Sequence, residues 1–273
     1  MAEIRCHSNW RLLQCSYKES RPFKPGEAMT DQPFTVVGAD RPSRWIVTCD
    51  HASNRVPDCL GGDLGIAPAD MARHIAYDVG AAGVARRLAE RLNARAILSD
   101  FSRLVIDPNR GEDDPTLIMK LYDGTIIPAN RHVGETETQR RLDAFYRPYH
   151  AALAELAARR DDSVICAVHS FTPRLNGRAP RPWPIGVLYS HLDERLARPL
   201  IARLVAEGLR TGDNEPYLGH LDGDSIDRHA LRTGRPNVLI ELRNDLIGQE
   251  DGQIAWADRL APILDEVLAS SQL

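Results

Sequence analysis

The sequence predicts a single α/β domain, a three-layer sandwich with helices on both faces of a mostly parallel or mixed central sheet. Short apolar runs rich in β-favouring residues alternate along the chain with amphipathic helical segments, which is typical of this fold class. Residues 163–168 are apolar almost throughout rather than alternating, which indicates a strand buried on both faces. No repeat or linker divides the 273 residues, so we expect one domain.

The hydrophobic pattern places the elements. We expect strands at residues 34–37, 45–49, 96–99, 104–106, 163–168, 185–189 and 237–241. We expect helices at residues 79–93 and 135–159, after Tyr189, around residues 225–233, and at the carboxyl end, where Ile254 to Leu268 carry an apolar stripe. Pro148 should kink or split the second helix, because proline has no N–H to donate. Residues 211–225 are rich in Gly and Asp and are expected to form a loop.

The first 30 residues differ in character from the rest. They show no sustained hydrophobic period and end in a segment that contains Pro22, Pro25 and Gly26. We expect residues 1–30 to be a disordered or loosely packed extension and residues 31–273 to be the folded domain. Met29 is a candidate for the true start of translation, which would explain the change in composition.

The composition excludes several functional classes. A hydrophobic content of 43%, a charged content of 26% and a formal net charge of −4 describe a globular protein without the basic surface that nucleic acid requires. No apolar run approaches the roughly 20 residues of a membrane span, and the amino terminus has no secretory h-region. The five cysteines form no CxxC pair, which favours reduced thiols and a cytoplasmic location.

Polar side chains stand at the ends of three apolar runs. His51 follows residues 45–49, His169 follows residues 163–168, and Glu241 follows residues 237–240. Ligands of open α/β sheets collect outside the carboxyl ends of strands, and two imidazoles with a carboxylate suit a metal-assisted hydrolase. Alternatives remain at each position, since a loop histidine can be structural, a strand-end histidine can bond to backbone, and a buried glutamate can pair with an arginine.

A second group follows residues 104–106. Asn109 and Arg110 come directly after Asp107 and Pro108. A guanidinium group binds a carboxylate through two parallel hydrogen bonds, and an adjacent amide adds a donor. The pair therefore suits an anionic substrate, although a salt bridge between Asp107 and Arg110 would explain the same residues.

Five blocks of the chain together resemble the N-formylglutamate amidohydrolase family, which in turn is similar to zinc carboxypeptidases. They recur in order between about residues 45 and 265, and their combination is more specific than any one of them. The blocks are CDHASNRVP at 49–57, VIDPNR at 105–110, VHS at 168–170, RPWPIGVLY at 181–189 and LIELRNDLI at 239–247. The resemblance implies a zinc-carboxypeptidase-like or phosphorylase-like sandwich and an amidohydrolase domain over residues 31–273.

The resemblance also implies roles for individual residues. In the carboxypeptidases a His-Ser after a strand supplies a zinc ligand, an Asn-Arg pair binds the substrate carboxylate, and a Glu-Leu-Arg strand supplies the general base. These roles fall on His169, on Asn109 with Arg110, and on Glu241, and Arg243 would orient Glu241 or bind a side-chain carboxylate. His229 and His132 are secondary candidates. The expected substrate is a small N-formyl or other N-acyl amino acid.

The first block departs from the carboxypeptidase pattern. That pattern has His-x-x-Glu, whereas this chain has His51 followed three residues later by Asn54. An amide is a poor zinc ligand, so another carboxylate must complete the site. Asp78, which opens a predicted helix and resembles an aspartate block of the family, is the expected third ligand with His51 and His169. A helix N-cap is the alternative role for Asp78.

Three other functions are alternatives to this hypothesis. A non-catalytic carboxylate-binding protein on the same fold would tolerate Asn54, and a zinc-dependent hydrolase of small peptides or other N-acyl amino acids would use the same residues. A serine or cysteine amidohydrolase fits less well. The chain has no Gly-x-Ser-x-Gly motif, and Cys49 and Cys166 lie within expected strands. No sequence motif selects one acyl group, one amino acid, one metal or one oligomeric state.

Overall fold

A seven-stranded sheet forms the centre of the molecule. The computed structural model describes residues 32–273, so the predictions for residues 1–30 and for Met29 lie outside the described residues. The strands follow the spatial order β1-β3-β2-β6-β9-β7-β8. Their bounds are β1 Phe34–Val37, β2 Trp45–Cys49, β3 Arg95–Ser99, β6 Val164–Phe171, β7 Ile185–Leu188, β8 Thr211–Asp213 and β9 Asn237–Arg243.

The sheet is mixed, with a parallel centre. Strands β3, β2, β6 and β9 pair in parallel, as do β7 and β8, whereas β1 pairs antiparallel with β3 and β7 pairs antiparallel with β9. The carboxyl ends of β2, β6 and β9 therefore lie at the same edge of the sheet. This architecture confirms the predicted α/β sandwich with a mixed central sheet.

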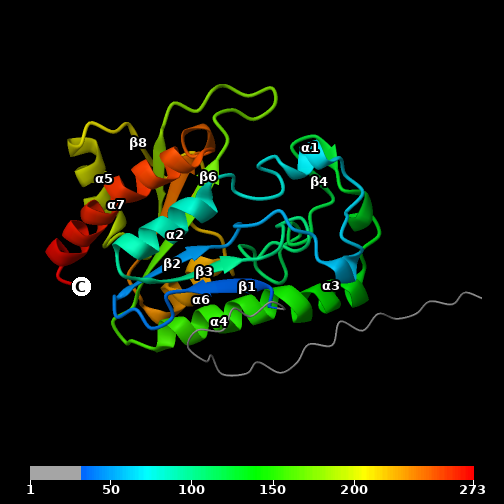
Figure 1. Ribbon diagram of the computed structural model, residues 1–273, viewed down its shortest axis with the longest axis horizontal. Helices are drawn as coiled ribbons and strands as arrows, with labels where there is room; N and C mark the ends of the chain where they lie inside the picture. Colours follow the sequence, from blue (N-terminus) through cyan, green and yellow to red (C-terminus); the bar gives the residue numbers. More distant parts are fainter. Residues whose placement is uncertain (1–31) are drawn as a thin grey trace, which may run out of the picture.

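Helices cover both faces of the sheet (Figure 1). Helices α2, α5 and α7 pack on one face, and α4 and α6 pack on the other. Short helices α1 and α3 lie beyond the sheet edge with the hairpin β4–β5. The remaining bounds are α1 Pro68–Met71, α2 Ala81–Arg91, β4 Leu121–Tyr122, β5 Thr125–Ile126, α3 Glu135–Arg141, α4 Arg147–Ala158, α5 Ala197–Ala206, α6 Ser225–His229 and α7 Glu250–Ser270.

Alternation along the central strands decides which side chains reach the site. Val168 and Ile240 pack into the cluster under α2, α5 and α7, whereas Ala167 and Leu239 face α6. Because side chains alternate along a strand, the next residues on the α6 face are His169 and Glu241. These two residues are paired across β6 and β9 in the sheet register. The fold thus places an imidazole beside a carboxylate at the carboxyl end of two neighbouring strands.

Some elements differ from the predictions. Leu104, Val105 and Ile106 are fully buried but form a turn rather than a strand, and they pack in a second apolar cluster outside the sheet. A short buried apolar run has the same appearance in either setting, which is why the prediction was wrong. The Gly- and Asp-rich loop begins with the short strand β8, and the hairpin β4–β5 was not anticipated.

The expected helix at 135–159 is divided as Pro148 predicts. A π-helical segment, Leu142–Tyr146, separates α3 from α4, and Pro148 is in the first turn of α4. Cys49 and Cys166 are buried free thiols in β2 and β6. Among residues 32–273, no helix has both the length and the apolar character that crossing a bilayer demands.

Candidate metal centre and active site

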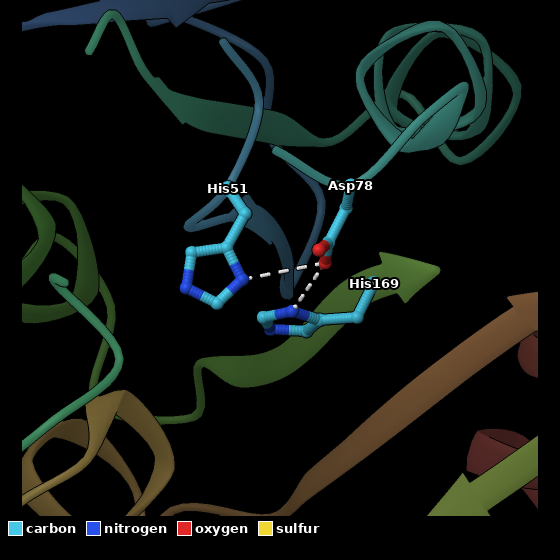
Figure 2. Close-up of side chains that lie close together, drawn as sticks. All are labelled: His51, Asp78 and His169. Carbon is cyan, nitrogen blue, oxygen red and sulfur yellow. Dashed lines mark hydrogen bonds and ion pairs between the residues drawn. The ribbon is translucent and has the colours of Figure 1, made fainter. Parts of the chain in front are cut away.

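His51, Asp78 and His169 converge at the carboxyl end of the sheet (Figure 2). One ligand atom from each lies within 4.8 Å of the others, and all three side chains are buried. His51 follows β2, His169 belongs to β6, and Asp78 precedes α2. Asp78 Oδ2 is 2.9 Å from His169 Nδ1 and 3.4 Å from His51 Nδ1. Both imidazoles therefore present Nδ1 to the same carboxylate.

Backbone contacts hold Asp78 in this position. Its N–H donates to the His51 carbonyl at 2.9 Å, and its Oδ2 accepts the Ser170 N–H at 3.2 Å. The chain then turns into α2 through Gly80, whose φ of 81° suits glycine and whose missing Cβ would meet the Ile247 carbonyl oxygen at 2.1 Å. Gly80, rather than Asp78, is the N-cap residue of α2, so the alternative capping role does not apply.

The outer nitrogen of each imidazole faces another buried carboxylate. His51 Nε2 lies 2.7 Å from Asp107 Oδ1, and His169 Nε2 lies 3.5 Å from Asp50 Oδ2. Asp50 also accepts a hydrogen bond from Tyr149 Oη. An imidazole whose Nε2 donates to a carboxylate directs the lone pair of Nδ1 toward a metal ion, and such pairs are usual around metal-binding histidines.

The charges around this group favour a bound cation. Burial raises the pKa of a carboxyl group, yet the His51 and His169 imidazoles hold the pKa of Asp78 well below its usual value. Burial also opposes protonation of His169, but the neighbouring carboxylates of Asp50 and Asp78 raise its pKa well above the usual value. Two imidazole nitrogens and a carboxylate oxygen, all buried and within reach of one point, are a donor set that zinc accepts.

Glu241 completes the acidic side of the site. It is 6% exposed on β9, and its Oε2 has no hydrogen-bond partner among the described residues. No arginine among residues 32–273 forms an ion pair with it, so the alternative structural role is not seen there. Burial raises the pKa of Glu241 to about 8, the nearby Asp78 adds to the shift, and His169 opposes it. An unpaired carboxylate is costly to bury, which marks Glu241 as a candidate functional group.

These residues open into a cavity of about 360 Å³. Its walls combine the candidate metal ligands and Glu241 with polar, aromatic and apolar side chains. The further lining residues are His74, Arg103, Asn109, Arg110, Tyr122, Ser170, Phe171, Thr172, Leu188, Tyr217, Leu218, Gly219, Leu221, Asp224 and Leu239. A volume of this size accommodates a small molecule.

Asn109 and Arg110 lie in the cavity wall as expected for a substrate-binding pair. Asn109 Oδ1 accepts the Ser225 N–H at 3.2 Å, which leaves the Nδ2 group of Asn109 available to donate. Arg110 Nη1 donates to the Asn109 carbonyl at 2.7 Å, and no carboxylate among the described residues pairs with Arg110. The alternative salt bridge to Asp107 is absent, because Asp107 instead pairs with Arg103 at 2.8 Å.

Several other candidates lie elsewhere. Arg243 pairs with Asp245 at 2.8 Å and is not among the residues that line the cavity. Asn54 is exposed, and its amide donates to the Met71 carbonyl, so the structure brings Asp78 rather than Asn54 to the histidines. His132 is exposed. His229 is buried, with its Nε2 2.8 Å from His150 Nδ1.

The outer partners of the two histidines were not predicted from the sequence. Asp50 immediately precedes His51, and Asp107 immediately precedes the Pro108-Asn109-Arg110 segment, so both lay within recognised blocks. Tyr149 and Arg103 carried no such signal, because only the packing of α4 and of the 101–107 turn brings them to the site.

Comparisons with known proteins identify the family of this chain. A family model described as N-formylglutamate amidohydrolase matches residues 43–248. A gene product of Agrobacterium tumefaciens of known crystal structure is 35% identical with a TM-score of 0.84, covering 89% of this chain and 97% of that one. The N-formylglutamate amidohydrolase of Ralstonia eutropha JMP134 has a similar fold, with 22% identity, a TM-score of 0.64, and coverage of 88% of this chain and 98% of that one. A search of curated proteins finds no match. The match over residues 43–248 shows that this chain belongs to the N-formylglutamate amidohydrolase family.

Proposed function

We propose that this protein is a metal-dependent amidohydrolase that cleaves the amide bond of an N-formyl amino acid, with N-formylglutamate as the expected substrate. The observation that carries the proposal is the convergence of His51 Nδ1, His169 Nδ1 and an Asp78 oxygen within 4.8 Å at the wall of a cavity that Glu241 also lines. Membership of the family and the name of the Ralstonia eutropha relative support this substrate class.

His51, Asp78 and His169 are proposed to hold the metal ion. When bound, a divalent ion such as zinc supplies Lewis acidity, which activates a water molecule and polarises an acyl oxygen. Asp107 and Asp50 keep the two imidazoles in the orientation that ligation needs. Asp107 itself is fixed by Arg103, whose Nη2 lies 2.8 Å from it, so the site rests on buried partners rather than on mobile surface groups.

Glu241 is the proposed general base. It accepts a proton from the attacking water and delivers that proton to the nitrogen of the leaving amine. Oε2 of Glu241 has no hydrogen-bond partner in the described part of the chain, which leaves this oxygen available for the transfer. Its place beside His169 in the sheet register brings it next to the proposed ligands without making it one of them.

Arg110 and Asn109 are proposed to bind the carboxylate of the amino-acid part. The unpaired guanidinium of Arg110 supplies charge, and the free Nδ2 group of Asn109 supplies a hydrogen-bond donor. Binding at this position fixes the amide beside Glu241 and lowers the entropic part of the barrier. Arg243 is not assigned a part in substrate binding, because its guanidinium is paired with Asp245.

Elemental analysis of the purified protein, followed by hydrolysis of a panel of N-acyl amino acids, tests the proposal. We expect about one divalent ion per chain and release of formate from N-formyl amino acids, both lost after chelation. Glu241→Gln serves as the control for contaminating hydrolases. A protein that binds N-formylglutamate without hydrolysing it would instead be the non-catalytic carboxylate-binding protein, and release of amino acids from small peptides alone would indicate a peptidase.

A further inference from the structure

The arginines around the cavity differ in whether their charge is already neutralised. Arg103 pairs with Asp107 at 2.8 Å and approaches Asp78 at 3.5 Å, and Arg243 pairs with Asp245 at 2.8 Å. A guanidinium that already binds a carboxylate has little capacity left for a second one. Arg110 lines the cavity without a carboxylate partner, but the proposed function assigns it to the carboxylate of the amino acid.

Arg181 is a second guanidinium without an acidic partner, and it lies behind the cavity wall in contact with three of the residues that line it. It lies between β6 and β7, and no carboxylate among residues 32–273 forms an ion pair with it. Its Nη1 donates to the Thr172 carbonyl at 3.1 Å and to Tyr217 Oη at 3.0 Å. The guanidinium carbon is 4.8 Å from the centre of the Tyr217 ring and 5.7 Å from that of Phe171. Phe171, Thr172 and Tyr217 all line the cavity.

These contacts orient the guanidinium while leaving one of its edges free. Both of these hydrogen bonds use Nη1, so Nε and Nη2 donate to no atom of the described residues. Neither Nε nor Nη2 of Arg181 is among the buried polar atoms that lack a hydrogen-bond partner. This edge of the guanidinium is therefore accessible to solvent. Nε and Nη2 together form the fork that binds a carboxylate through two parallel hydrogen bonds. Stacking on the Tyr217 ring reduces the conformational entropy that Arg181 would lose on binding.

The cavity requires such a group if its substrate is a diacid. Its lining includes the acidic side chains Asp78, Asp224 and Glu241. A second substrate carboxylate would be repelled by these groups and would lose its hydration on entering, unless a cation received it. Arg110 can balance one carboxylate, and Arg181 is positioned to balance another.

We propose that Arg181 binds the side-chain carboxylate of a diacid substrate and thereby sets the preference for an N-formylated acidic amino acid. This assignment rests on the proposed function, in which Arg110 holds the other carboxylate. It replaces Arg243, whose charge is neutralised by Asp245, as the residue that reads the side chain. Arg181 touches the substrate away from the reacting amide, so its contribution is to specificity.

Comparison of N-formyl-L-glutamate with N-formyl-L-glutamine tests the assignment, because the two differ by one charge at nearly constant shape. We expect the wild-type protein to prefer the glutamate derivative in kcat/KM. Arg181→Gln should reduce that preference about 10- to 100-fold, mainly through KM for the diacid, with little change for the glutamine derivative. Arg178→Gln is the matched control, since Arg178 is an exposed arginine of the same loop that, unlike Arg181, forms no hydrogen bond to a residue lining the cavity.

The outcomes separate the two proposals. An unchanged preference in Arg181→Gln, an equal loss for both substrates, or loss of the preference in Arg243→Gln instead would overturn the role of Arg181. Equal hydrolysis of both substrates by the wild type would also overturn it while leaving the amidohydrolase proposal intact. If neither compound is hydrolysed, the proposed function fails, and calorimetric titration with N-formylglutamate still decides whether binding depends on Arg181.

Discussion

Glu241, His51 and His169 reach the cavity from similar positions in the fold. Each is a polar side chain at the end of a buried strand, or just beyond it, where alternation or the chain turn directs it toward the cavity. Their environments then give them different properties. The imidazoles have carboxylate partners on both nitrogens, whereas Glu241 has a free oxygen and a pKa raised to about 8 by burial. This difference underlies their separate proposed roles as ligands and as base.

Glu241→Gln is expected to lower kcat by about 10²–10⁴-fold, because an amide cannot accept the proton of the attacking water. The metal content should not change, since Glu241 is not one of the three clustered ligands. Steady-state kinetics and elemental analysis on the same preparation measure both quantities. Full activity in this variant would contradict the mechanism, and loss of metal would show that Glu241 is itself a ligand.

Asp50→Asn tests the outer partners of the histidines. The substitution removes the charge 3.5 Å from His169 Nε2, and we expect metal affinity to fall about 10- to 100-fold. Asp50 is a cleaner target than Asp107, because Asp107 also neutralises Arg103 and its loss would leave a buried charge. Competition with a chromogenic chelator measures the affinity. Unchanged metal affinity would mean that Asp50 contributes to the contact with Tyr149 rather than to metal binding by His169.

At the scale of elements, α4 and α6 support the segment that carries Asn109 and Arg110. Nε2 of His150, on α4, lies 3.0 Å from the Pro108 carbonyl oxygen. Nδ1 of the same ring lies 2.8 Å from Nε2 of His229, on α6. Tyr146, the last residue of the π-helical segment, donates to the Arg110 carbonyl. A π-helical segment often marks a functional region, and here Tyr146 at its end and His150 one turn later both contact residues 108–110.

The histidine pair predicts a loss of stability in acid. Burial lowers the pKa of His150 to about 3 and that of His229 to about 4; Arg228 adds to both shifts and Asp50 opposes them. In the unfolded chain both groups titrate near 6.5, so below that pH the unfolded state binds more protons and the free energy of unfolding falls toward pH 4. Between pH 7 and 5 the loss should be about 2 kcal/mol for each histidine.

Urea unfolding of the wild type and of the His150→Gln/His229→Gln variant at pH 7 and pH 5 measures this effect. The variant should lose less stability than the wild type over the same interval, whatever its stability at pH 7. An equal loss in both proteins would show that the acid sensitivity comes from other groups, such as the histidines of the candidate metal centre.

At the scale of the whole molecule, the candidate metal centre joins parts of the chain that are distant in sequence. His51, Asp78 and His169 come from the turn after β2, from the turn before α2 and from β6, so a bound ion would bridge three separate segments. A ligand that binds only the folded state stabilises it in proportion to the logarithm of its concentration relative to Kd. The metal is therefore expected to contribute to folding stability as well as to activity.

Removal of the metal by a chelator should lower the melting temperature, and addition of zinc should restore it. His169→Ala should show a lower melting temperature that neither treatment changes, because one of the three ligands is missing. Differential scanning calorimetry with and without chelator measures the shift. If a chelator changes neither the melting temperature nor the activity of the wild-type protein, the metal assignment is wrong.

The sequence determined much of the sheet because its central strands are buried on both faces and read as apolar runs. Residues 34–37 and 45–49 were predicted with their observed bounds. The prediction at 104–106 was wrong, because burial in a turn outside the sheet produces the same short apolar run. Strand β8 was missed, because Thr211–Asp213 contains a glycine and an aspartate and pairs only along one edge.

For the site, the sequence by itself determined which residue types stand at the strand ends and which family the motif blocks indicate. Those features are local, because they depend on alternation along a strand and on short motifs. Only the tertiary structure decided that Asp78 rather than Asn54 joins the two histidines, that Asp50 and Asp107 lie behind them, and that Arg243 is neutralised while Arg181 is not. Charge pairing depends on distances between side chains from different segments, and a linear pattern does not contain those distances.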